Sequence, residues 1–228
     1  MLMGVLENVD RWLRPYRYHF EDQEIREHKE QKKRKKKKLK RNTKRIVSLE
    51  EQKKTKEFLA RGEIGVKLTT LNSILKKEKV LQLLQRSGYN LGYFYHDKDY
   101  HQLAIKFKAN SSWRYKERNG AKIKKLKPLV YHKDTRTQDR THMIPIGFHG
   151  SEDDARLLVG FSAKINKGEL KKFENYIANV NDREEILWFI NIVRQKDNTA
   201  IWHATVWDKD NNIIDDKKFH DKSQFVWL

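Results

Sequence analysis

Residues 166–207, NKGELKKFENYIANVNDREEILWFINIVRQKDNTAIWHATVW, decide the fold class. The first part, residues 166–180, has apolar residues at spacings of three and four, which predicts an amphipathic helix. The runs ILWFINIV (186–193) and AIWHATVWD (200–208) are rich in aromatic and β-branched residues. The polar turn at 196–198 predicts that these runs form two neighbouring strands.

The residues on either side of this unit predict further strands and more helix. Helical spacing over 66–87 predicts one or two helices that end near Gly88. Strands are expected as a hairpin over 89–109 around an Asp97–Asp99 turn, as strand, turn and strand over 128–150, in LLVGF at 157–161, and in 209–219. Strands before and after a helix predict an α+β fold with an antiparallel sheet.

The first 62 residues predict a basic helical arm in front of an α+β domain over 63–228. Residues 31–45, QKKRKKKKLKRNTKR, hold eleven Lys or Arg in fifteen positions. Charge repulsion within such a block predicts that the arm is partly disordered when free. Composition leaves three uses open: a solvated tail, a contact with nucleic-acid phosphates, and a nuclear-localisation run.

Composition bounds the class of protein. The chain has 228 residues, enough for one domain and an appendage, and its 6 Trp, 9 Tyr and 10 Phe predict a packed core in spite of 36% charged residues. The absence of Cys excludes disulfides, thiolate metal sites and cysteine nucleophiles. Glu7 and Asp10 interrupt the N-terminal apolar run, and no apolar run approaches the roughly 18 residues of a membrane helix. A cytoplasmic protein without a membrane partner is therefore expected.

The net charge of +19 is distributed unevenly. Residues 1–128 hold 35 Lys and Arg against 15 Asp and Glu, whereas residues 129–228 hold 15 against 16. A positive excess confined to one half indicates a polyanionic partner, with DNA as the first candidate and RNA as the second. Aromatic side chains between cations either stack on bases or pack inward in a hairpin. The residues expected to bind nucleic acid are Lys35, Lys36, Lys37, Lys38, Arg41, Trp113, Arg114, Tyr115 and Arg118.

A second group of residues supplies what phosphodiester hydrolysis requires. His142 is a candidate general base, because the reference pKa of histidine, about 6.5, allows it to accept a proton near neutral pH. Asn166 and Glu174 offer the oxygen ligands that a hard divalent cation prefers. Arg140 offers a planar guanidinium that binds phosphate.

Helix geometry draws attention to Glu174. At 100° per residue it lies about 40° from Leu170, at the edge of the apolar face, where a carboxylate needs a partner. Asn166 precedes it by eight residues, or ~12 Å along a continuous helix. Both residues can serve one ion only if Asn166 lies at an irregular helix start and water completes the site, and Gly168 permits such a start.

These residues match the pattern of a known family. Asp139-Arg140-Thr141-His142 resembles the Asp-Arg-Gly-His motif of the ββα-metal DNA/RNA non-specific endonucleases. The segment from Asn166 to Glu174 resembles that family's Asn-Arg-Gly-x-x-x-x-Leu-Glu segment, with the same spacing. The resemblance covers residues 128–207; Thr141 stands at the family's Gly, and the family's Gln shortly before the Asn is not found.

The resemblance implies a ββα-metal motif and a role for each residue. His142 is then the general base, and Asn166 is the direct ligand of one mostly hydrated Mg²⁺ or another hard divalent cation such as Mn²⁺. Glu174 would hold metal-bound water, and Arg140 would contact the substrate. Asp139 and His149 are accessory candidates for the same pocket.

Each site residue also has a purely structural interpretation. The alternatives are a strand histidine bonded to the backbone for His142, a capping box with Glu169 for Asn166, an ion pair with Lys171 or Arg183 for Glu174, and a pair with Asp139 or Glu152 for Arg140. Three further histidines, His132, His203 and His220, are expected in strands or turns.

The expected function is a metal-dependent, sequence-tolerant endonuclease that hydrolyses DNA, with RNA as a second substrate. The alternative is a non-catalytic nucleic-acid-binding protein that uses the basic N-terminal half. A third hypothesis is a scaffold that binds acidic proteins through residues 31–45. No pattern in the sequence identifies a protein inhibitor or activator.

Overall fold

The computed structural model describes residues 49–50, 53, 65–112, 125–148 and 154–228. The chain divides into two compact units, Met1–Ile46 and Val47–Leu228, and the first lies wholly outside the described residues. The predicted basic arm lies outside them as well, except for three residues near its end. Also outside are the predicted site residues Lys35, Lys36, Lys37, Lys38, Arg41, Trp113, Arg114, Tyr115, Arg118 and His149.

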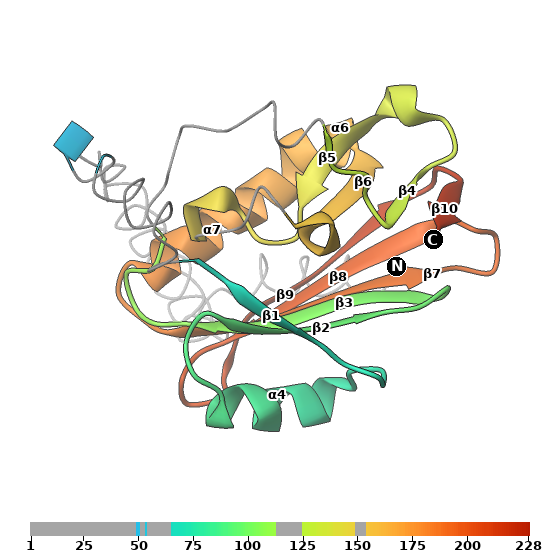
Figure 1. The fold of residues 1–228 in the computed structure, drawn as a ribbon. Helices are drawn as coiled ribbons and strands as arrows, with labels where there is room; N and C mark the ends of the chain where they lie inside the picture. The colour runs from blue at the N-terminus through green and yellow to red at the C-terminus, as the bar shows by residue number, and fades with distance from the viewer. Residues whose placement is uncertain (1–48, 51–52, 54–64, 113–124, 149–153) are drawn as a thin grey trace, which may run out of the picture. The chain divides into compact units, whose positions relative to one another are not determined.

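The larger sheet has six strands in the order β1-β2-β3-β7-β8-β9 (Figure 1). The strands are β1 (Lys67–Thr70), β2 (Leu91–His96), β3 (Tyr100–Phe107), β7 (Ile186–Arg194), β8 (Ala200–Trp207) and β9 (Ile213–Asp221). Each neighbouring pair is antiparallel except β1 and β2, which are parallel. The predicted hairpin 89–109 and the two strong strands at 186–193 and 200–208 are confirmed as β2–β3 and β7–β8.

The smaller sheet has four strands in the order β10-β4-β6-β5. They are β10 (Phe225–Trp227), β4 (Val130–His132), β6 (Leu158–Ser162) and β5 (Gln138–His142). β4 and β6 are parallel, and the other pairs are antiparallel. The α+β prediction is confirmed, but the prediction of a purely antiparallel sheet is wrong, because each sheet contains one parallel pair. In the larger sheet this pair is joined by a helical crossover, the connection that parallel strands require.

The helices are α4 (Lys77–Arg86), α6 (Ala163–Ile165), the π-helical turn η5 (Asn166–Leu170) and α7 (Lys171–Asn181). Single 3₁₀ turns lie at η2 (Thr135–Thr137), η3 (Ile146–Phe148) and η4 (Ala155–Leu157). α6, η5 and α7 follow one another without a break, and the backbone at both junctions has right-handed helical angles. The helix predicted over 166–180 is therefore present and begins three residues earlier.

Apolar side chains cover both faces of the six-stranded sheet. In β3, Leu103 and Ile105 pack on the side of α7 and the smaller sheet, while Ala104 between them packs on the side of α4 (Figure 1). This alternation is the period of two that a strand imposes. On the α7 side, Phe173 lies edge-on to Trp188 with ring centroids 5.9 Å apart. Burial of each such side chain contributes roughly 1.5–3 kcal/mol.

The segment 66–87 was predicted as one or two helices that end near Gly88, and only its second part is helical, as α4. Its first part is the strand β1, in which Leu68 packs against the core while Lys67 and Thr69 are exposed. Leu68 and Leu71 fit a spacing of three as well as an extended strand, so periodicity alone did not separate the two. Pairing with β2 favours the strand, and helix begins only at Lys77.

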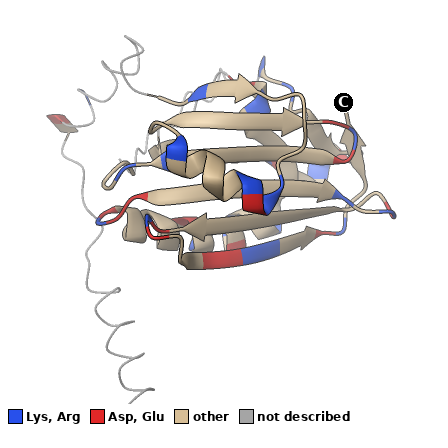
Figure 2. Cartoon of the chain, turned by 90° about the horizontal axis from the view of Figure 1, so that it is seen from below, with Lys and Arg blue, Asp and Glu red and all other residues tan. Residues whose placement is uncertain are grey.

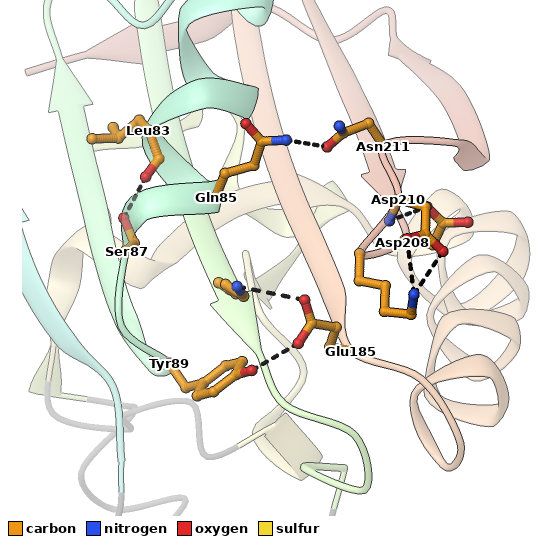
Figure 3. Close-up of polar contacts among 10 residues, drawn as sticks. Leu83, Gln85, Ser87, Tyr89, Glu185, Asp208, Asp210 and Asn211 are labelled. Atoms are coloured by element: carbon orange, nitrogen blue, oxygen red, sulfur yellow. Dashed lines mark hydrogen bonds and ion pairs between the residues drawn. The ribbon is translucent and has the colours of Figure 1, made fainter.

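The C-terminal end of α4 is tied to the sheet by side-chain hydrogen bonds (Figure 3). Ser87 Oγ donates to the carbonyl of Leu83 at 2.7 Å, and Gln85 Nε2 donates to Asn211 Oδ1 in the β8–β9 turn at 2.6 Å. Nearby, Tyr89 donates its hydroxyl to Glu185 at 2.7 Å. The bond between Ser87 and Leu83 lies within the end of the helix, whereas the Gln85–Asn211 bond and a contact of Ser87 Oγ with the Tyr93 hydroxyl of β2, at 2.8 Å, tie that end to the larger sheet.

Charges of both signs are interspersed over the described part of the chain (Figure 2). β9, for example, carries two adjacent acidic residues followed by two lysines. Such an edge strand resists pairing with other chains. No helix in the described ranges is long and apolar enough to span a membrane.

Candidate functional site

The predicted site residues lie on one supersecondary unit, the β5–β6 hairpin and the helix that follows it. In the hairpin Asp139 pairs with Phe161, and His142 pairs with Leu158. β6 ends at Ser162, and the helix begins with the next residue. The start of the helix therefore lies directly beside the start of β5.

Asp139 and Asn166 meet at this junction. Asn166 Nδ2 donates to Asp139 Oδ2 at 3.0 Å, and Lys167 Nζ lies 3.2 Å from the same carboxylate. The contact joins residues 27 apart in sequence. Because the amide nitrogen faces Asp139, the amide oxygen Oδ1 points elsewhere, and no described residue donates a hydrogen bond to it. Asp139 was predicted as an accessory residue, and the structure places it in direct contact with the predicted metal ligand.

Asn166 begins a π-helical turn and is not the helix cap. The N-cap is Ser162, whose Oγ accepts a long hydrogen bond of 3.5 Å from Ile165 N. The alternative of a capping box formed by Asn166 and Glu169 is wrong, because the backbone of Asn166 is already helical. The expected irregularity occurs as the π-turn itself, a feature often found at functional sites.

Glu174 lies on α7 and is only 8% exposed. Lys171 Nζ is 3.6 Å from its Oε2, so the predicted alternative of an ion pair with Lys171 is confirmed. Leu170 and Glu174 are four residues apart, the spacing of neighbours on one face of an α-helix, and Asn166 begins the π-turn that ends at Leu170. The amide and the buried acid are thus carried by one continuous helix, with the buried Leu170 between them in sequence.

Arg140, Thr141 and His142 complete β5. Strand alternation places Asp139 and Thr141 on one face of β5, and Arg140 and His142 on the other. Arg140 is exposed, whereas His142 is 5% exposed and Thr141 2%. The Thr141 hydroxyl is buried without a hydrogen-bond partner among the described residues. The structure thus brings Asp139 and Asn166 together. His142 lies three residues after Asp139, about 10 Å further along β5.

A buried His132–Asp221 pair lies behind this junction and was not predicted. His132, correctly expected in a strand, lies on β4 with its Nε2 2.7 Å from Asp221 Oδ2, and their side chains are 1% and 2% exposed. The same carboxylate accepts a hydrogen bond from Ser162 N at 2.6 Å. Burial raises the pKa of Asp221. The hydrogen bond from His132 and those from the backbone lower it by more, so the net shift of the pKa is downward. His132 and Asp221 are 89 residues apart, and no local pattern marks them as partners.

The side chain of Gln138 packs across Gly160, on the face of the hairpin opposite Asp139. Gln138 Oε1 accepts a hydrogen bond from His132 N at 2.8 Å. A Cβ on Gly160 would lie 1.9 Å from that oxygen and 2.8 Å from Tyr131 Cβ. The glutamine side chain therefore lies flat across Gly160, and only glycine leaves it room.

The side-chain groups near Asn166 can be compared with the ligands that a metal cation requires. No group of three or more His, Cys, Asp or Glu side chains in the described part of the chain is placed to hold a metal. The oxygen groups at the junction are the Asp139 carboxylate and the Asn166 amide, and the buried Glu174 carboxylate follows eight residues after Asn166 on the same helix. This set suits a hard cation that keeps most of its water, as Mg²⁺ does.

Comparison of the chain with protein-family models, with curated proteins and with solved structures gives no match. The functional interpretation therefore depends on the geometry of these residues.

Proposed function

We propose that the protein is a metal-dependent, sequence-tolerant endonuclease that hydrolyses phosphodiester bonds of DNA, and of RNA as a second substrate. The observation that carries the proposal is the contact between Asp139 and Asn166 at the π-turn. A carboxylate that accepts from the amide nitrogen leaves the amide oxygen available, and an amide oxygen is a ligand that a hard cation takes.

Mg²⁺, or Mn²⁺ in its place, fits the groups present. Asn166 would bind it directly through Oδ1, and Glu174 would hold one of its water molecules. The buried hydroxyl of Thr141, on the same strand face as Asp139, is a further polar group that an ordered water would satisfy. When bound, the cation offsets negative charge on the phosphate and on the departing oxygen.

The other residues of β5 act on water and on the phosphate. His142 accepts a proton from the attacking water. Arg140, whose side chain is exposed, binds a phosphate oxygen through its guanidinium. β5 is the last strand in the order of the smaller sheet, and Arg140 is its exposed residue, so a phosphate would approach β5 at Arg140. The ββα-metal motif of the family described above is the arrangement proposed for β5, β6 and the helix.

The basic first half of the chain holds the nucleic acid. Its Lys and Arg residues attract the phosphate backbone without reading sequence, so binding is expected to weaken steeply with salt. The positive excess of residues 1–128 supports this role. Residues 129–228, which carry β5 and α7, hold 15 Lys and Arg against 16 Asp and Glu, and they contribute the chemistry.

The test is incubation of supercoiled plasmid with the purified full chain and Mg²⁺, with and without EDTA. We expect nicking that EDTA abolishes. His142→Ala is expected to lower the cleavage rate by roughly 10²–10⁴-fold, the usual contribution of a general base, while DNA affinity stays near that of the wild type. Asn166→Ala should abolish the response to Mg²⁺.

Two results would overturn the proposal. Retardation of DNA without nicking by the folded wild-type chain favours the non-catalytic binding protein. Loss of both folding and DNA binding in His142→Ala identifies His142 as a structural strand residue.

A further inference from the structure

We propose that the buried pair of His132 and Asp221 is a positioning device for Asn166, and that it determines how tightly the site binds a divalent cation. The inference rests on the proposed function, since it concerns the same amide. It adds two residues that lie outside both segments on which the family resemblance depends. Neither touches the proposed substrate or cation, so both would act only through other groups.

The first link runs from Asp221 to the helix. Asp221 Oδ2 accepts the backbone N–H of Ser162 at 2.6 Å. Ser162 is the N-cap of the helix and precedes Asn166 by four residues, about one turn. A shift of this anchor is therefore transmitted through a single helical turn to the amide.

The second link runs from His132 to β5. Gln138 Oε1 accepts the backbone N–H of His132 at 2.8 Å, and Gln138 immediately precedes Asp139. Gln138 and Ser162 are also register partners in the hairpin. The bond to Gln138 uses only the backbone of residue 132, but the imidazole itself contacts Thr137, the residue before Gln138, through Nδ1 at 3.1 Å. The two side chains of the pair thus contact the residues that lead into β5 and into the helix, at the end of the hairpin where Asp139 and Asn166 meet.

The pair itself has little freedom to move. Asp221 Oδ1 also accepts Ser223 N at 3.1 Å, and His132 Nδ1 lies 3.1 Å from Thr137 Oγ1. The His132 ring packs edge-on against Phe225 at 4.8 Å between centroids. With both side chains at most 2% exposed, these hydrogen bonds act in a medium of low dielectric, where they are strong and costly to break.

Two substitutions at Ser162 isolate the link to the helix. Ser162→Pro removes the N–H that Asp221 accepts, and the φ of −47° at this position is close to the value that proline adopts. Ser162→Ala keeps the N–H and removes only the hydroxyl, so it is the matched control. Asp221→Asn is the second test variant, and its control is Asp216→Asn, which alters a His–Asp pair on β8 and β9 that is not in contact with the hairpin.

Two measurements on the full chain report on position and not on stability alone. The first is the NMR shift of the Asn166 side-chain amide, assigned from its loss in Asn166→Ala. The second is the Mn²⁺ concentration that half-saturates the folded protein, followed by electron paramagnetic resonance of free Mn²⁺. Thermal unfolding is recorded for every variant, so that both readouts are taken where the protein is folded.

We expect Ser162→Pro and Asp221→Asn to shift the Asn166 resonance and to raise the Mn²⁺ midpoint about tenfold, as loss of outer-shell support does. Ser162→Ala and Asp216→Asn should change neither. If Ser162→Pro lowers only the unfolding temperature and leaves the resonance and the midpoint at their wild-type values, the pair is merely structural and the inference is wrong. If wild-type protein binds no Mn²⁺, the proposed function fails, while the resonance still decides whether the pair positions Asn166.

Discussion

Two His–Asp pairs in this molecule have the same chemistry and opposite surroundings. His132 and Asp221 lie 2.7 Å apart with side chains 1% and 2% exposed, whereas His203 and Asp216 lie 2.5 Å apart with 22% and 31% exposed. The first pair joins β4 to the end of β9 inside the core. The second joins neighbouring strands, β8 and β9, on the α4 side of the larger sheet.

The comparison shows that a large shift in pKa does not by itself mean a large contribution to stability, because that contribution depends on how deeply the pair is buried. Partial burial raises the pKa of Asp216, but hydrogen bonds from Lys77 and His203 lower it to about 2. Water still screens this pair, so a large shift there corresponds to little stability. Removal of one partner from the buried pair, in contrast, leaves an uncompensated group in the core.

The largest effect is therefore expected for Asp221→Ala. Loss of the carboxylate leaves the His132 ring and the Ser162 N–H unsatisfied in the core, and should lower the free energy of unfolding by roughly 3–5 kcal/mol. Asp216→Ala should lower it by less than about 1 kcal/mol. Urea unfolding followed by tryptophan fluorescence measures both. Equal losses in the two variants would show that burial does not distinguish the pairs.

A smaller effect is expected at Gly160. A Cβ in Gly160→Ala displaces the Gln138 side chain and breaks its hydrogen bond to the His132 backbone, so we expect a loss of roughly 1–3 kcal/mol. Gly168→Ala is the control, because a Cβ there meets nothing within 4 Å and alanine favours helix by roughly 0.8–1 kcal/mol. Urea midpoints that move in opposite directions confirm the prediction, and a neutral Gly160→Ala contradicts it.

Acid should reduce the contribution of both pairs to stability. The folded-state pKa of each aspartate is depressed, so each contributes stability above the unfolded value of about 3.9 and loses it as pH falls through its folded value. For Asp216 this range extends down to about pH 2. The gap in unfolding free energy between wild type and Asp221→Asn should therefore shrink below about pH 4. A gap that widens on acidification would reverse the sign of the proposed linkage.

The smallest effect is expected for Lys77→Ala. Its Nζ lies 2.6 Å from Asp216, and the loss of this donor should raise the pKa of Asp216 toward its ordinary value. Because the lysine side chain is 37% exposed, the free energy of unfolding should change by less than about 0.5 kcal/mol. Carboxyl-carbon NMR titration measures the pKa. An unchanged titration would assign the shift to His203 instead.

The fold was predictable where periodicity is local. The strands at 186–193 and 200–208 and the helix after residue 162 each contain enough alternating or helical spacing to be recognised alone. The strand β1 was missed, because its four residues gain their structure from pairing with β2. The parallel pair β4–β6 was missed for a related reason, since its one paired position, Val130 with Val159, joins segments 29 residues apart.

The site was predictable only as far as its motif. The spacing of Asn166 and Glu174 singled out both residues as candidates, and the structure places them on one continuous helix with the Asn166 amide bonded to Asp139. His132 and Asp221 carry no signal of their own, because the hydrogen bond that makes them partners exists only in the folded chain. The capping prediction for Asn166 was wrong since Ser162, four residues earlier, already starts the helix.

The π-turn lies inside one continuous helix, between the α-helical segments α6 and α7. A single residue deleted within it, such as Gly168, would turn Asn166 by about 100° relative to Glu174. Phe173 and Ile177 would keep their places in the core because they lie beyond the deletion, whereas Ile165, which packs against the core ahead of it, would be turned away. The length of this turn therefore couples the direction of the amide to the packing of the first part of the helix.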